Sequence, residues 1–172
     1  MTSNTPAMPI KVNAYRHQKE AYAFVLKTFR QNGGSGGASL LMEMGTGKTL
    51  TAIAVAGTLS DAMRINRLLI VAPLSILGVW KEEFEKFADF PYTLEVLEGT
   101  SDKKREQLTK FRGDGLQVVV VNYESCWRLE KEISDWSPDM IIADEGHKMK
   151  SHKTQASKAM HYLGAQAKYR LL

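Results

Sequence analysis

One short stretch constrains the fold more than any other: an apolar run, Ala38 to Met42, that leads through a turn into Gly45-Thr46-Gly47-Lys48-Thr49. Glycines let the backbone approach a polyphosphate, and successive N–H groups then point at its oxygens. Lys48 supplies a mobile positive charge for the β- and γ-phosphates, and the Thr49 hydroxyl is placed to bind Mg²⁺. The stretch therefore predicts a strand, a phosphate-binding loop and a helix that begins near Lys48.

The loop departs from the usual pattern G-x-x-x-x-G-K-[ST] at one position, because Met42 stands where the first glycine is expected. The alternative is an ordinary strand–turn–helix with a surface lysine. The flanking sequence favours the phosphate loop. An apolar strand precedes it, and Leu50 to Ala56, a run rich in small residues, follows it as a helix suited to packing on a sheet.

The bulk properties are those of a soluble globular protein with one domain. The chain has 172 residues, of which 44% are hydrophobic and 24% charged, and its net charge is +4. No apolar run approaches the roughly 20 residues that cross a bilayer. The single cysteine, Cys126, excludes an internal disulfide. We predict an intracellular protein with no membrane partner, and the basic charge permits a nucleic-acid partner without demanding one.

Strand patterns alternate with helix patterns along the rest of the chain. The expected strands are residues 38–42, 67–72, 92–97, 117–121, 140–143 and 169–172. The expected helices are residues 15–30, 48–56, 76–87 with Ser75 as N-cap, 101–111, 125–133 and 154–163. Continuous apolar strands separated by helices predict an α/β fold with a mainly parallel sheet that helices cover on both faces. Residues 1–11 are expected to form a flexible arm, and residues 12–172 the domain.

A second pattern completes the predicted active site. The apolar strand 140–143 delivers two adjacent carboxylates, Asp144 and Glu145, to the sheet edge at which ligands of parallel sheets bind. Asp144 can hold a magnesium ion, and Glu145 can orient and deprotonate the water that attacks the γ-phosphate. The alternative is that the pair caps the next segment, but the phosphate loop elsewhere in the chain favours catalysis. His147 follows the pair and is expected to couple the nucleotide site to other parts of the protein.

These segments, in this order, resemble the first motor domain of superfamily-two helicases, specifically the Swi/Snf-type DNA-dependent ATPases. In that group a Met and an acid precede Gly-x-Gly-Lys-Thr, which also explains Met42. The similarity covers residues 12–172. The segments that carry it are Arg16-His17-Gln18, Met42 to Thr49, Val71 to Trp80 with Glu83-Phe84, Val121 to Glu124, and Asp144-Glu145-Gly146-His147, a DEAH-like box.

The resemblance implies a RecA-like P-loop NTPase domain that uses ATP and Mg²⁺. It implies ATP hydrolysis coupled to movement on duplex DNA or to remodelling of protein–DNA complexes. The implied ATP-binding residues are Arg16, Gln18, Met44, Gly45, Thr46, Gly47, Lys48 and Thr49. The implied catalytic residues are Lys48, Asp144, Glu145 and His147, and the implied magnesium ligands are Thr49 and Asp144.

The resemblance also implies backbone contacts with double-stranded DNA that do not depend on its sequence. The candidate contacts are Pro73, Ser75, Asn122, Tyr123, Lys148 and Lys150. For the basic stretch that contains the two lysines, a solvated loop is the alternative. Trp80 has helical spacing with Phe84 and Phe87, which favours a core anchor over a platform for base stacking.

In the resembled family, a second RecA-like domain with an arginine finger follows this one, and it lies outside these residues. We therefore expect the isolated lobe to hydrolyse ATP weakly or not at all. Two alternatives stay open: a phosphotransferase built on the same loop, and a nucleotide-binding interaction module without turnover. For a bacterial or phage member the expected location is the cytoplasm or nucleoid.

Overall fold

One parallel sheet organises the molecule. The computed structural model describes residues 5–33, 36–38, 47–144 and 154–172. In these residues six strands form a sheet in the order β1-β6-β5-β2-β4-β3, and every pairing between neighbours is parallel. The strands are β1 (Gly36–Ala38), β2 (Arg67–Ala72), β3 (Tyr92–Val96), β4 (Leu116–Asn122), β5 (Met140–Ala143) and β6 (Tyr169–Leu171). The predicted parallel sheet is confirmed.

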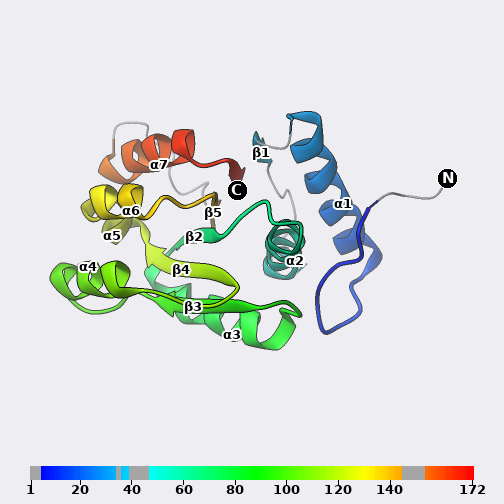
Figure 1. The fold of residues 1–172 in the computed structure, drawn as a ribbon, viewed down its shortest axis with the longest axis horizontal. Helices are drawn as coiled ribbons and strands as arrows, with labels where there is room; N and C mark the ends of the chain where they lie inside the picture. The colour runs from blue at the N-terminus through cyan, green and yellow to red at the C-terminus, as the bar shows by residue number, and fades with distance from the viewer. Residues whose placement is uncertain (1–4, 34–35, 39–46, 145–153) are drawn as a thin grey trace.

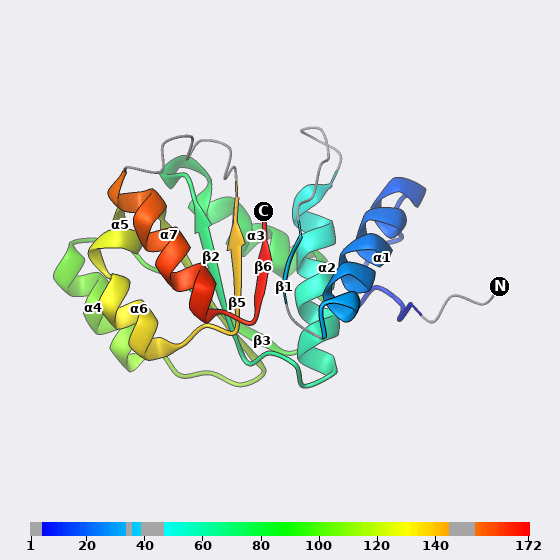
Figure 2. The same ribbon diagram turned by 90° about the horizontal axis from the view of Figure 1, so that it is seen from above.

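Helices cover both faces of the sheet, as the sequence predicts. The helices are α1 (Arg16–Gln31), α2 (Lys48–Asp61), α3 (Leu77–Phe87), α4 (Ser101–Lys110), α5 (Tyr123–Arg128), α6 (Glu130–Trp136) and α7 (Gln155–Gln166). Helices α1, α2 and α3 lie on one face, and α4 to α7 lie on the other (Figures 1 and 2). Within the described ranges, none of these helices is both long and apolar enough to cross a membrane.

The alternation of side chains along each strand divides the core into two layers. In β2, Leu68 and Ile70 face the α1–α3 layer, whereas Leu69 and Val71 face the α4–α7 layer. All four side chains are fully buried. Burial on both faces explains why the sequence shows a continuous apolar run here instead of an alternating one.

Two local predictions are wrong. Ser75 does not cap α3, because Leu74–Ile76 form a 3₁₀ turn and α3 begins at Leu77 without a side-chain cap. The single helix predicted for residues 125–133 is two helices, which meet at Leu129. Leu129 lies outside helical geometry and is fully buried, so the break places its side chain in the core. The predicted strand 38–42 lies outside the described residues beyond Ala38.

The amino-terminal arm is attached to the domain in its described part. The N–H of Asp89 donates to the carbonyl of Pro9 at 2.9 Å, and the N–H of Lys11 donates to the carbonyl of Phe87 at 2.9 Å. These two hydrogen bonds tie the arm to the end of α3. They concern only the end of the segment, and the flexible arm expected for residues 1–11 stays a prediction.

Cys126 is fully buried in α5, where its sulfur lies 3.8 Å from the sulfur of Met160 in α7. Burial, with a smaller contribution from Glu130, raises the pKa of its thiol to about 12.

We therefore expect almost no reaction of Cys126 with a thiol reagent at pH 8 in the native chain, and complete reaction in denaturant. The thiol of the unfolded chain ionises at a lower pH than the thiol of the folded chain. The free energy of unfolding should therefore fall as the pH rises from about 9 towards 12. Rapid labelling of the native chain at pH 8 would contradict this.

Candidate nucleotide site

The candidate residues gather at one edge of the sheet. In Figure 2, β5 and β6 point towards the end of the molecule at which α2 begins. Asp144 follows β5, Pro73 follows β2, and Asn122 ends β4. Because all strand pairings are parallel, the carboxyl ends of these strands share this edge with the start of α2.

The start of α2 carries the last three residues of the predicted phosphate loop. Gly47 is the N-cap residue and adopts a left-handed conformation, with φ 87° and ψ 33°. That conformation costs an L-residue about 1–2 kcal/mol, which accounts for a glycine here. The Thr51 hydroxyl donates to the Gly47 carbonyl at 3.1 Å. Lys48 is exposed and Thr49 is half-buried in the first helical turn.

Gln18 lies directly against Gly47. Its side chain is buried, and a Cβ added to Gly47 would lie 1.9 Å from the Gln18 Nε2 atom. Its Oε1 atom accepts a hydrogen bond from the N–H of Tyr15 at 2.8 Å, at the start of α1. The structure therefore brings together Gln18 and Gly47, two predicted ATP-binding residues. Arg16, predicted with them, is paired with Glu20 at 3.0 Å on an exposed surface.

Asp144 is held by contacts from three other elements. Its N–H donates to the carbonyl of Val71 in β2 at 2.8 Å. Its carbonyl accepts from the hydroxyl of Tyr123 in α5 at 2.7 Å. Its Oδ2 atom accepts from the indole N–H of Trp80 in α3 at 2.8 Å. Both its backbone and its carboxylate thus have fixed positions at the sheet edge.

The donor set at this edge suits magnesium. Mg²⁺ prefers oxygen ligands and usually takes one or two carboxylates together with waters and substrate phosphates. Asp144 offers its second carboxylate oxygen, and Thr49 offers a hydroxyl. The described residues contain no group of three or more His, Cys, Asp or Glu side chains that could enclose a metal ion. The chemistry of these two donors fits a cation that is shared with a nucleotide.

Two of the four described DNA-contact candidates use their side chains inside the protein. The Asn122 Oδ1 atom accepts from the N–H of Ser125 at 3.1 Å and so caps α5. Tyr123 donates its hydroxyl to Asp144. By contrast, Ser75 is exposed and Pro73 is half-buried after β2.

Several predicted site residues lie outside the described residues, and their roles stay predictions. They are Met44, Gly45, Thr46, Glu145, His147, Lys148 and Lys150.

Sequence reasoning missed the hydrogen bonds that Trp80 and Tyr123 make to Asp144. The prediction that Trp80 is a core anchor is confirmed, since its side chain is only 3% exposed. One signal for the additional role was available: a buried indole N–H needs an acceptor, and Trp80 comes after β2, which lies next to the strand that Asp144 follows.

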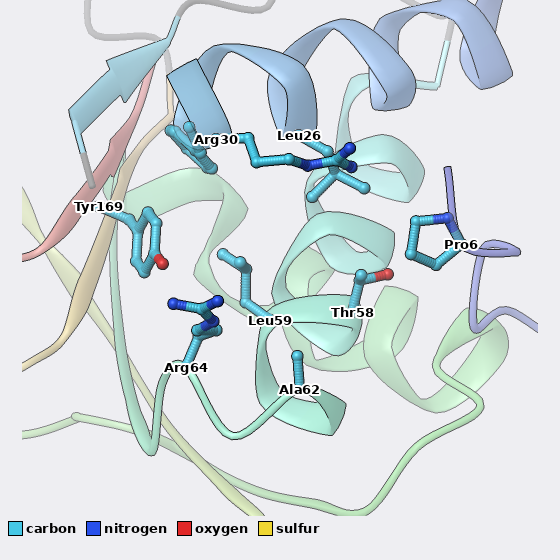
Figure 3. A pocket seen from close by; sticks show the side chains of 9 residues that line it. Pro6, Leu26, Arg30, Thr58, Leu59, Ala62, Arg64 and Tyr169 are labelled. Carbon is cyan, nitrogen blue, oxygen red and sulfur yellow. The ribbon is translucent and has the colours of Figure 1, made fainter. Parts of the chain in front are cut away.

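A pocket of about 170 Å³ lies elsewhere, between α1, α2 and β6 (Figure 3). Its lining includes Thr58, Leu59 and Ala62 at the end of α2, with Tyr169 opposite. Lys48 stands at the other end of this 14-residue helix, about 20 Å away at 1.5 Å per residue. The pocket is therefore separate from the candidate nucleotide site.

A parallel sheet, a helix that begins at a left-handed glycine followed by lysine, and a carboxylate at the same sheet edge define the class of RecA-like phosphate-loop domains. Within that class the chain belongs to the family of SNF2-related domains, whose family model matches residues 17–172. The resemblance seen in the motifs is thereby confirmed.

Individual relatives agree with this family. The chain is 30% identical over 157 residues to the DNA excision repair protein ERCC-6-like of Danio rerio, covering 88% of this chain and 10% of that protein. It is 32% identical over 153 residues to the DNA repair and recombination protein RAD54B of Homo sapiens, covering 84% of this chain and 16% of that protein. The chain therefore spans only a small part of the curated relatives it matches.

The fold also matches solved structures. The Sulfolobus solfataricus SWI2/SNF2 ATPase core in complex with dsDNA superimposes with a TM-score of 0.78 at 26% identity. The match covers 99% of this chain and 33% of that one. The core domain of the same ATPase, a second structure, gives a TM-score of 0.74 at 24% identity and supports the fold.

Proposed function

We propose that this chain is the ATP-binding lobe of a DNA-dependent ATPase that moves on duplex DNA or remodels protein–DNA complexes. One observation carries the proposal. Gln18 packs on Gly47 at the head of α2, at the same sheet edge as the anchored Asp144. This arrangement belongs to a chain of the SNF2-related family, whose relatives include proteins named for DNA repair and recombination. Such relatives also favour an intracellular location.

In this proposal each site residue has a defined task. Gln18 and the loop ending at Gly47 bind the nucleotide, and Lys48 contacts its β- and γ-phosphates. Thr49 and Asp144 hold Mg²⁺, which supplies a positive charge for the phosphate oxygens when it is bound. Glu145 positions the attacking water and takes its proton, while His147 couples the site to other parts of the protein.

Duplex DNA is the proposed partner, bound through its phosphates. The solved core that includes dsDNA supports this partner. Pro73 and Ser75 lie exposed or half-buried at the sheet edge, and Lys148 and Lys150 are proposed to add charge. Because the chain covers 33% of that core, we propose that a second lobe supplies the remaining catalytic groups. The 172 residues alone are then expected to hydrolyse ATP slowly.

Lys48→Ala is expected to weaken binding of a fluorescent ATP analogue by about 10- to 100-fold, because a charged hydrogen bond to phosphate contributes about 1.5–3 kcal/mol. Glu145→Gln should bind the analogue normally but should abolish DNA-stimulated hydrolysis in a protein that carries the complete ATPase core. Lys27→Ala, which removes an equal charge from the exposed surface of α1, is the matched control and should change neither property.

Three outcomes would count against the proposal. If the unaltered chain and Lys48→Ala bound the nucleotide equally well, the predicted phosphate loop would not take part in nucleotide binding. Transfer of phosphate to a small acceptor would favour a phosphotransferase. Tight nucleotide binding by the complete core, with no hydrolysis in the presence of duplex DNA, would favour an interaction module.

A further inference from the structure

We propose that Trp80 and Tyr123 are positioning residues for Asp144 and that they set the affinity of the nucleotide site for Mg²⁺. The inference rests on the proposed function, because it concerns the carboxylate expected to hold the cation. Neither residue is expected to touch the nucleotide or the metal. Both act through hydrogen bonds to Asp144.

The bond from Trp80 fixes the carboxylate itself. The donor–acceptor distance of 2.8 Å lies within the normal range for an N–H donor, so the indole and the carboxylate are in direct hydrogen-bond contact. The indole offers a single donor, and the Trp80 ring is only 3% exposed, so the packing of α3 holds that donor in place. Because Oδ2 accepts this hydrogen bond, we infer that the other carboxylate oxygen of Asp144 faces the cation.

The bond from Tyr123 fixes the backbone next to that carboxylate. Its hydroxyl donates to the Asp144 carbonyl at 2.7 Å, while the Asp144 N–H donates to the Val71 carbonyl at 2.8 Å. Both polar groups of the Asp144 backbone are therefore engaged. The carboxylate then has a defined starting point for its side-chain torsions, which limits the directions in which its oxygens can point.

The two positioning residues act from opposite faces of the sheet. Trp80 belongs to the core layer formed with α1, α2 and α3, whereas Tyr123 packs against the layer of α4 to α7. Asp144, at the carboxyl edge between the layers, is thus held from both sides. A carboxylate that is already oriented loses little conformational freedom when a cation binds. Partners of this kind commonly change metal affinity by about 10- to 100-fold when removed.

The test uses substitutions that delete one donor each: Trp80→Phe and Tyr123→Phe. A fluorescent ADP analogue is titrated against the 172-residue chain at a series of Mg²⁺ concentrations and, separately, in EDTA. Each substitution should raise the Mg²⁺ concentration for half-maximal enhancement of binding by about 10-fold. Binding in EDTA should stay within about twofold of the unaltered chain, because Asp144 then has no cation to hold.

Two residues of the same chain give matched controls. Trp136 is also buried, and its indole Nε1 atom has no hydrogen-bond partner within the described residues. Tyr22 donates to, or accepts from, the Thr58 hydroxyl at 2.6 Å, near the far end of α2. Trp136→Phe and Tyr22→Phe remove the same chemical groups as the test variants, and both should leave the Mg²⁺ dependence of binding unchanged.

The outcomes separate this inference from the proposed function. An unchanged Mg²⁺ dependence in both test variants, with normal nucleotide binding, would overturn the inference alone. Equal losses in EDTA and in Mg²⁺ would assign Trp80 and Tyr123 a merely structural role and would also overturn it. No nucleotide binding by the unaltered chain under any condition would overturn both proposals. If Trp80→Phe fails to fold by circular dichroism, Tyr123→Phe, which loses only one hydroxyl, decides the matter.

Discussion

Gly47→Ala is expected to weaken nucleotide binding by at least about 10-fold and to lower the melting temperature. Gly47 has a positive φ of 87°, a conformation that costs other residues about 1–2 kcal/mol. The added Cβ would also lie 1.9 Å from the Gln18 Nε2 atom. The Gln18 side chain must then move, and it loses the hydrogen bond that its Oε1 atom accepts from the Tyr15 N–H. Thermal unfolding and titration with a fluorescent ATP analogue measure the two effects.

Gly78→Ala is the matched control for this substitution. Gly78 is the second residue of α3, and a Cβ added there would meet nothing within 4 Å. The exchange should not lower the melting temperature, since alanine has a higher helix propensity than glycine, and it should leave nucleotide binding unchanged. If Gly47→Ala and Gly78→Ala had the same melting temperature and the same nucleotide affinity, Gln18 could not be packed closely on Gly47.

Phe84→Ala is expected to lower the free energy of unfolding by about 3–5 kcal/mol, the usual cost of removing a buried ring. Phe84 is fully buried between α3 and the sheet, with the rings of Tyr92 and Phe90 centred 5.0 Å and 6.3 Å away. Domains of this kind have a total stability of only about 5–15 kcal/mol, so the loss would leave the chain marginal. Urea denaturation followed by circular dichroism measures it.

Val79→Ala is the control for Phe84→Ala. It tests whether the lower free energy of unfolding comes from the loss of a buried side chain and not from any substitution in α3. Val79 lies on the same helix but is 42% exposed, so its truncation should cost within about 0.5 kcal/mol. A loss below about 1 kcal/mol for Phe84→Ala would mean that the ring does not fill the core between α3 and the sheet.

The strands could be predicted because their environment leaves a strong trace in the sequence. Residues 118–121 are four successive valines, fully buried on both faces of the sheet. Only a central strand covered by helices on each side gives such a run, and the same logic predicts the parallel topology. The start of α2 at Lys48 and the end of β5 before Asp144 follow from that topology as well.

The helix ends were harder to predict, because competing local contacts decide them. Ser75 has a good capping side chain, yet the chain forms a 3₁₀ turn there and α3 starts at Leu77. After β4, by contrast, Asn122 caps α5, which begins at Tyr123, two residues earlier than the sequence predicts. Serine and asparagine both suit an N-cap position in the sequence. Whether each one caps the helix that follows depends on the path of the backbone after the strand.

The internal contacts of the site could not be predicted from spacing. Trp80 and Asp144 are 64 positions apart, and their hydrogen bond depends on the packing of α3 against the sheet. Tyr123 and Asp144 are 21 positions apart and meet only because α5 lies on the other face. Sequence patterns indicate which residue types a site requires. The donors that orient them come from the assembled layers.

The position of β6 has a practical consequence for experiments on this chain. β6 lies between β1 and β5, and the Leu172 N–H donates to the Ala38 carbonyl at 3.0 Å. A polyhistidine tag fused after Leu172 would thus emerge at the sheet edge where Asp144 stands, and imidazoles bind divalent cations. The amino-terminal arm is bonded to the end of α3, towards the opposite edge. Purification tags for Mg²⁺ titrations therefore belong at the amino terminus.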